Sequence, residues 1–146
     1  MNIFEYLNLD EERALYGTHD SLIRHCTFAG PADGESALKE CRDITLEDCE
    51  FHLRYPFWHD EGVEIDDCEL TPLCRAALWY SNNISVSNSN LHGIKPLREC
   101  SDIKISDSDI SSLEFGWFSK DIEMRDTHAE GEYFMMRSER LDFKGV

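Results

Sequence analysis

The sequence predicts an all-β protein, a right-handed parallel β-helix of about six rungs. Three observations lead to this prediction. A segment of alternating apolar and polar residues recurs along most of the chain at intervals of 19 to 23 residues. Its apolar positions are mostly β-branched, as a pleated surface prefers. Further apolar positions between the copies keep the same spacing, so each repeat provides more than one strand.

The first strand of each repeat is the clearest element. The five strongest copies are ITLEDCEF from Ile44, VEIDDCEL from Val63, ISVSNSNL from Ile84, IKISDSDI from Ile103 and IEMRDTHA from Ile122. Their starts differ by 19, 21, 19 and 19 residues. An earlier copy begins at Ser21 and a partial one at Leu141. Alternation with a period of two indicates strands with one buried face.

A bend and a second short strand follow the first strand. Asp or Asn stands at the bend, where these residues tolerate unusual backbone angles. The next position is small in every copy: Cys26, Cys49, Cys68, Ser89, Ser108 and Thr127. The chain has six cysteines, no CxxC pair and no export signal. We therefore expect buried, reduced thiols and neither disulfides nor a zinc site of the usual spacing.

A third short strand completes the rung. It is indicated by one apolar column in the same register: Leu38, Phe57, Leu78, Leu97, Gly116 and Met135. Stacked rungs pair each strand with its copy about 4.8 Å away, and crossovers between parallel strands are right-handed. Leucine-rich repeats are the alternative, because ITLEDCEF also fits their core pattern. They require leucine three places earlier, where this chain has Cys41, Asp60, Ser81, Cys100 and Ser119.

The two ends are predicted to differ. Residues 1–20 do not fit the repeat and are expected to form an N-terminal cap, whereas residues 21–146 form the rungs. At the C-terminus, LDFKGV starts a rung and stops without a polar cap. An open apolar rung invites pairing. We expect either a homo-oligomer that buries this end or a chain truncated from a longer one.

Charge and hydropathy narrow the possible partners. The formal net charge is −16, with 30 acidic and 14 basic residues. This balance argues against nucleic acid and anionic membrane surfaces as partners. The sequence has no apolar run of membrane-spanning length and no signal peptide, which predicts a cytoplasmic protein.

Several segments carry a family resemblance. They are ERALYG from Glu12, GESALKECR from Gly34, YPFW from Tyr55, RAALWYSNNI from Arg75, KPLR from Lys95 and GEYFM from Gly131. In this order they resemble the bacterial domain-of-unknown-function 3737 family. The resemblance implies a single-stranded right-handed β-helix of the pectate-lyase-like type and supplies no activity. Members of that family are longer, which also implies truncation at Val146.

One column between the repeats is a candidate binding site. It is a stripe of aromatic and cationic residues, formed by Lys39, Trp58, Trp79, Arg98 and Trp117. If it points outward, flat rings with flanking polar groups suit sugar rings. Trp and Arg are equally typical of protein interfaces. A third possibility is that packing turns this column inward.

A metal site and catalysis are weaker candidates. The bend acids Asp48, Asp67, Asp107 and Asp126 form a column in which calcium could bridge neighbouring carboxylates, although a solvated row of turns explains them equally well. We expect no cofactor. Arg75, Lys95 and Arg98 lie near Glu99 and Asp102 in sequence, but nothing fixes them into one site. The six histidines have no ligand spacing.

The sequence therefore leaves enzymatic activity open and favours its absence. The favoured function is a non-catalytic scaffold or interaction domain that self-associates, through the C-terminal rung or the stripe. The alternative is a carbohydrate-binding or polysaccharide-cleaving β-helix protein.

Overall fold

A computed structural model describes residues 1–11, 14–29 and 35–146. The first strands of successive rungs form an eight-stranded parallel sheet. Its strands are β1 (Asn2–Glu5), β3 (His19–Arg24), β6 (Arg42–Glu47), β9 (Glu61–Asp66), β12 (Asn82–Ser87), β15 (Ser101–Ser106), β18 (Lys120–Arg125) and β21 (Glu139–Lys144). We call it the first-strand sheet.

Two further sides complete each turn. The second-strand sheet contains β2 (Asn8–Leu9), β4 (Thr27–Phe28), β7 (Glu50–Phe51), β10 (Glu69–Leu70), β13 (Asn90–Leu91), β16 (Asp109–Ser111) and β19 (His128–Glu130). The third side consists of a four-stranded and a two-stranded sheet. The former contains β5 (Glu35–Lys39), β8 (Tyr55–Trp58), β11 (Leu78–Trp79) and β14 (Leu97–Arg98), and the latter β17 (Glu114–Phe115) and β20 (Tyr133–Phe134).

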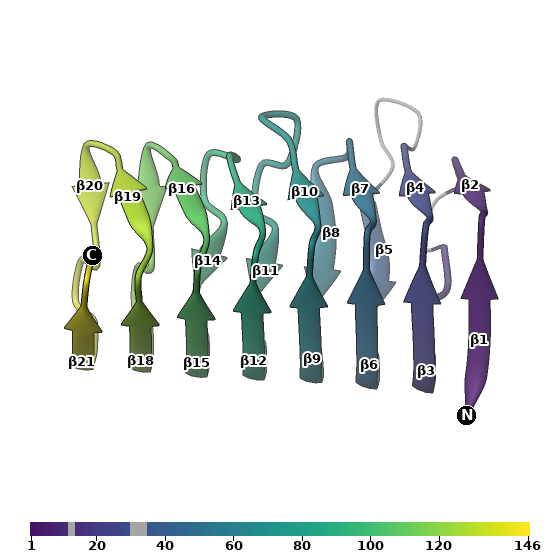
Figure 1. The fold of residues 1–146 in the computed structure, drawn as a ribbon, viewed down its shortest axis with the longest axis horizontal. Coiled ribbons are helices and arrows are strands. Elements are labelled where there is room, and N and C mark those ends of the chain that lie inside the picture. Colours follow the sequence, from purple (N-terminus) through teal and green to yellow (C-terminus); the bar gives the residue numbers. More distant parts are fainter. Residues whose placement is uncertain (12–13, 30–34) are drawn as a thin grey trace.

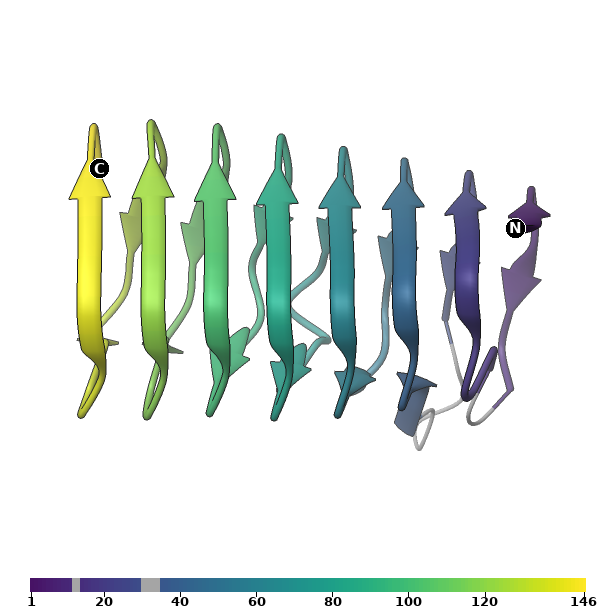
Figure 2. The same cartoon turned by 90° about the horizontal axis from the view of Figure 1, so that it is seen from below.

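The chain winds as a right-handed coil of about seven turns. In Figure 1 it rises along the first-strand sheet in front, returns downward behind, and advances from right to left. Figure 2 shows the same first strands side by side in one row. This confirms the predicted parallel β-helix. The described residues contain no helix that could cross a membrane.

The core is built from the columns that the sequence predicts. Ile84 pairs with Val63 on one side and with Ile103 on the other, and each of these three side chains is about 1% exposed. The rings of Phe28 and Phe51 stack at 4.8 Å in the next column. Repeated burial of equivalent side chains therefore forms one continuous core.

The small residue after each bend has a second role besides filling space. The backbone N–H of Cys68 donates to Ser89 Oγ at 3.0 Å, and that of Ser89 donates to Ser108 Oγ at 3.2 Å. The side chain thus accepts an N–H that the turn leaves outside the strand pairing. All six cysteines are free and buried, as predicted.

Two predictions about the repeat need correction. Residues 2–9, assigned to a cap outside the repeat, form β1 and β2, and Asn2 pairs with Ser21 at an offset of 19 residues. The predicted third-strand column keeps its register at Gly116 and Met135, but Gly116 has no side chain to fill the core. Phe115, which is 0% exposed, provides the large buried side chain of that rung.

The last strand has a neighbour on one side only. β21 pairs with β18, and its apolar side chains continue the two core columns. Leu141 is 41% and Phe143 is 38% exposed, whereas their register partners Ile122 and Met124 are about 1% and 0% exposed. Coverage of this strand by another subunit stays a prediction.

Candidate interaction surface

The predicted stripe is a real column on the third side. Its members are register partners on successive rungs: Lys39, Trp58, Trp79, Arg98 and Trp117. All are half-buried, while the preceding residue on each of the first four rungs is fully buried. Alternation along the short strand therefore turns the stripe outward, which answers the question that the sequence left open.

The rings of the stripe lie against one another. Trp58 and Trp79 have ring centroids 4.9 Å apart, and Trp79 stacks on Tyr80 at 5.3 Å with an interplanar angle of 11°. His59 stacks on Tyr80 at 5.1 Å. The ring faces thus point largely along the solenoid axis and contact each other. This arrangement stabilises the corner and leaves mainly ring edges for a ligand.

Arg98 replaces a ring in this stack. Its guanidinium carbon lies 5.6 Å from the ring centroid of Trp79, 6.0 Å from that of Trp117 and 5.7 Å from that of Phe118. Arg98 Nε is 3.5 Å from Glu99 Oε1. A planar cation can take the place of an aromatic ring because its flat face is attracted to the neighbouring π-systems.

The stripe borders a corner where the backbone is left-handed in every rung. Its residues have φ between 51° and 56° and include bulky types: Glu40, His59, Tyr80, Glu99, Phe118 and Arg137. The other corner, after the first strand, mostly carries Asp or Asn at this conformation. A bulky residue with a left-handed backbone costs about 1 kcal/mol in conformational free energy. Stacking of the His59 and Tyr80 rings offsets this cost at the corner.

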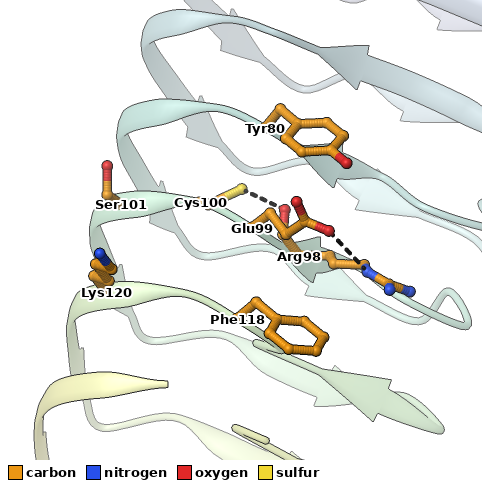
Figure 3. A pocket seen from close by; sticks show the side chains of 7 residues that line it. All are labelled: Tyr80, Arg98, Glu99, Cys100, Ser101, Phe118 and Lys120. Carbon is orange, nitrogen blue, oxygen red and sulfur yellow. Dashed lines mark hydrogen bonds and ion pairs between the residues drawn. The ribbon is translucent and has the colours of Figure 1, made fainter. Parts of the chain in front are cut away.

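An open depression lies where the corner lacks a ring. Figure 3 shows Tyr80 and Phe118 on either side of the rung that carries Arg98 and Glu99. The hollow has a volume of about 530 Å³, and Ser101 and Lys120 also line it. It is the part of the stripe that offers a ring face together with hydrogen-bonding groups.

Buried polar atoms without a hydrogen-bond partner gather on this side of the molecule. Within the described ranges they are Asp60 Oδ2, Trp79 Nε1, Arg98 Nε and Glu114 Oε2. Each belongs to a third strand or to the corner that follows it. Arg98 Nε and Glu114 Oε2 each lie 3.5 Å from an oppositely charged group, so that Asp60 Oδ2 and Trp79 Nε1 are the two of these atoms that have no polar contact.

Asp60 is the unusual member of an inward column that otherwise holds small residues. Its Oδ1 accepts the N–H of Cys41 at 2.7 Å, and its own N–H donates to Ser81 Oγ at 3.1 Å. The residue is 2% exposed. Burial raises the pKa of Asp60 to about 8, outweighing the hydrogen bond from Cys41. This carboxyl is therefore largely protonated at neutral pH.

A basic column was missed in the sequence. The N–H of Arg75 donates to Arg54 O and the N–H of Lys95 donates to Arg75 O, each at 2.8 Å, so the three residues lie on successive rungs. We call them the basic ladder. Their sequence spacings of 21 and 20 residues depart from the usual 19 and hid the alignment. Lys95 Nζ is 3.5 Å from Glu114 Oε2, whereas Arg54 and Arg75 are exposed and make no side-chain ion pair with any described residue.

The sequence segments that carry the basic ladder contain no acidic residue, although Glu114 of the next rung lies against Lys95. The segments 53–59, 72–80 and 93–98 contain four of the 14 basic residues and none of the 30 acidic ones. A chain with a net charge of −16 therefore carries one locally positive side. The net charge is a sum over the whole surface and does not show where the charges lie. The separation of basic from acidic residues becomes visible only in the folded structure.

The proposed calcium ligands are exposed bend residues. Asp48, Asp67, Asp107 and Asp126 all have φ between 47° and 53°. Asp48 Oδ2 is 2.7 Å from His25 Nδ1. Across the residues that the structure describes, no group of three or more His, Cys, Asp or Glu side chains is arranged to hold a metal ion. The bend geometry by itself accounts for Asp at these places, and calcium binding stays a weak prediction.

The histidines pair with acids on the surface. His92 Nε2 is 2.8 Å from Asp109 Oδ2, and His52 Nε2 is 3.3 Å from Glu50 Oε2. Among the described residues no serine or cysteine side chain donates a hydrogen bond to a histidine. The arrangement of a base-activated nucleophile is thus not found in this part of the chain.

Comparison with known proteins assigns a family. The model of the family described as "Protein of unknown function (DUF3737)" matches residues 2–146. A search among curated proteins finds no match. The match spans nearly the whole chain and agrees with the resemblance carried by segments such as YPFW and RAALWYSNNI. The chain therefore belongs to the DUF3737 family.

Proposed function

We propose that this chain is a non-catalytic β-solenoid interaction domain that self-associates. The observation that carries the proposal is the charge segregation. A basic ladder, in which Arg54 and Arg75 make no ion pair with any described residue, stands on a molecule whose net charge is −16. Exposed like charges on successive rungs repel by about 1 kcal/mol per pair in water. An acidic surface of a second copy would relieve that repulsion.

Exposed apolar side chains support the same function. Leu73, Ile94 and Leu113 are 63%, 42% and 47% exposed. Leu73 and Ile94 precede the ladder residues Arg75 and Lys95 by two residues and one residue, and Leu113 lines the same depression as Ile94. Grouped apolar side chains on a surface are typical of protein interfaces. The stripe and the last strand β21 remain further candidate contact surfaces.

The test is sedimentation velocity of the purified chain over a wide concentration range at physiological salt. We expect the weight-average sedimentation coefficient to rise with concentration towards that of a dimer. A monomer at every concentration would exclude self-association. Fluorescence of the three tryptophans then reports whether the stripe also enters the contact.

A carbohydrate-binding function is the alternative, supported by the depression between Tyr80 and Phe118. It offers ring faces beside the polar groups of Arg98, Glu99 and Ser101. A glycan panel with fluorescence titration tests this function. Binding that is lost in Tyr80→Ala and retained in Tyr6→Ala, a distant exposed tyrosine, would support it. No binding to any glycan would remove it.

A further inference from the structure

The second-strand side carries charges of opposite sign along its two edges. One edge is the basic ladder. The other is the bend between first and second strands, where Asp48, Glu50, Asp67 and Glu69 line a depression of about 170 Å³ together with Asn88 and Asn90. We call these four acids the acidic corner. Glu50 and Glu69 are register partners on β7 and β10, so they also lie one rung apart.

The two charged edges match rung by rung. Asp48, Glu50 and Arg54 belong to one rung, and Asp67, Glu69 and Arg75 belong to the next. On the rung after that, Lys95 corresponds to the neutral Asn88 and Asn90. Neighbouring rungs are about 4.8 Å apart on both edges. The four acids of the acidic corner and the unpaired arginines therefore share the same two levels of the solenoid.

We propose that two copies pair through their second-strand sides, related by a two-fold axis parallel to the solenoid axis. This rotation keeps every rung at its own level and exchanges the two edges. Arg54 and Arg75 of one copy then face the acidic corner of the other, and the contact occurs twice. An interface of this kind is isologous, with the same patch on both subunits. The inference rests on the proposed self-association and names its surface.

Apolar side chains and a hollow lie next to the basic ladder. Leu73, Ile94 and Leu113 are exposed there. Ile94 and Leu113 also line a depression of about 450 Å³, together with Pro72 and Gly131 and the polar residues His92, Ser111, Glu130 and Glu132. Apolar contact at this edge would add to the charge pairs of the proposed interface.

The net charge does not prevent this pairing. At physiological ionic strength the Debye length is about 8 Å, so repulsion between two chains is largely screened beyond that distance. Contacts of a few ångströms between Arg and Asp are screened much less. Charge pairs across the rim then select this orientation over one that brings two acidic corners together.

Charge reversal on each edge tests the pairing. Arg54→Glu with Arg75→Glu makes both edges acidic, and Asp48→Lys with Asp67→Lys cancels the negative charge of the acidic corner, where Glu50 and Glu69 remain. We expect each double variant alone to dimerise about tenfold or more weakly than the natural chain. An equimolar mixture should restore association, because the two variants complement each other along both edges. Sedimentation velocity and isothermal titration measure the two effects.

Two further variants keep the test decisive. Arg42→Glu with Lys104→Glu changes the net charge equally on the first-strand sheet, where both residues are exposed, and should dimerise like the natural chain. Asp48→Asn with Asp67→Asn tests the acidic corner with the residue that Asn88 already provides at the equivalent bend.

The outcomes separate the two proposals. A natural chain that dimerises while the Arg54/Arg75 variant dimerises equally well would overturn this surface and leave self-association standing. A mixture that stays monomeric would overturn it too. A natural chain that never associates would overturn the proposed function and this inference together.

Discussion

The backbone conformation at the corners of each rung restricts residue type as strongly as burial in the core does. Asp and Asn dominate the bend after each first strand because they tolerate positive φ. The sequence predicted that bend from its Asp column. It did not predict the equally left-handed second residue of each first strand, where φ is 52° at Asp43, 70° at Gly62 and 57° at Asn83. That column is as rich in Asp and Asn as the bend column, with Asp20, Asp43, Asn83, Asp102 and Asp121. The signal was therefore present, and it was missed because the column lies next to an alternating strand.

Asp60 provides the clearest test of a single residue. Its pKa is raised to about 8, so its contribution to stability is fully present at low pH and is lost as pH rises from about 4 through 8. The full loss is on the order of 5 kcal/mol. Asp60→Ser provides the hydroxyl that Ser81 and Ser119 supply on other rungs. We expect the variant to be more stable than the natural chain at about pH 9 and to have lost this pH dependence.

Chemical denaturation at about pH 5 and about pH 9 measures the difference. The matched control is Asp67→Ser, an exposed carboxyl at the other corner, which should leave the pH dependence in place. Equal stability differences at both pH values for Asp60→Ser would show that the buried carboxyl is not protonated as described.

The interior strands of this fold are stabilised by pairing with a copy of themselves on each side, whereas β1 and β21 at the ends of the sheet have one neighbour each. β-branched columns identified the first strands reliably, since one buried face produces a strict period of two. The third strands were harder to predict. They are as short as two residues, as in β11 (Leu78–Trp79), and the column has no side chain at Gly116, where Phe115 fills the core instead. Two residues are too few for any periodicity to appear.

Shortening a buried side chain in the first-strand core is predicted to reduce the free energy of unfolding strongly. Ile84→Ala removes a side chain that is about 1% exposed between Val63 and Ile103. We expect a loss of about 2–5 kcal/mol in the free energy of unfolding, because rigid neighbours cannot close the cavity. Ile3→Ala, at a side chain that is 54% exposed on β1, should change it by less than about 1 kcal/mol. Similar losses at both positions would argue against a stacked core.

The whole molecule distributes its charge in a way that composition conceals. A net charge of −16 predicted that anionic partners are unsuitable. The fold nevertheless gathers four bases on one side, through spacings that depart from the repeat. The candidate stripe could be predicted because it keeps the register. The basic ladder could not, because insertions between the second and third strands shift it by one or two residues.

The six native cysteines are buried, so that introduced surface cysteines can be labelled selectively for a distance measurement. Burial raises the pKa of Cys41, Cys74 and Cys100 to about 12. Since the thiolate is the reactive form, we expect these three cysteines to resist a thiol reagent until the chain unfolds. The other three are also buried, so that burial, and not a raised pKa at every position, protects all six thiols. Titration with a chromogenic disulfide, with and without denaturant, measures this. Rapid reaction of native thiols would contradict their burial.

The central claim is that equivalent residues of successive repeats lie directly above one another. Pulsed electron paramagnetic resonance on spin labels tests it most directly. Labels placed in the exposed first-strand column at Arg42→Cys and Lys120→Cys are four rungs apart, and moving the second label to Glu139→Cys adds one rung. Dilution with unlabelled chain isolates distances within one molecule. We predict separations of about 19 Å and about 24 Å, a step of one strand spacing. Equal separations for the two pairs, or a step unrelated to that spacing, would contradict the stacked fold and every surface derived from it.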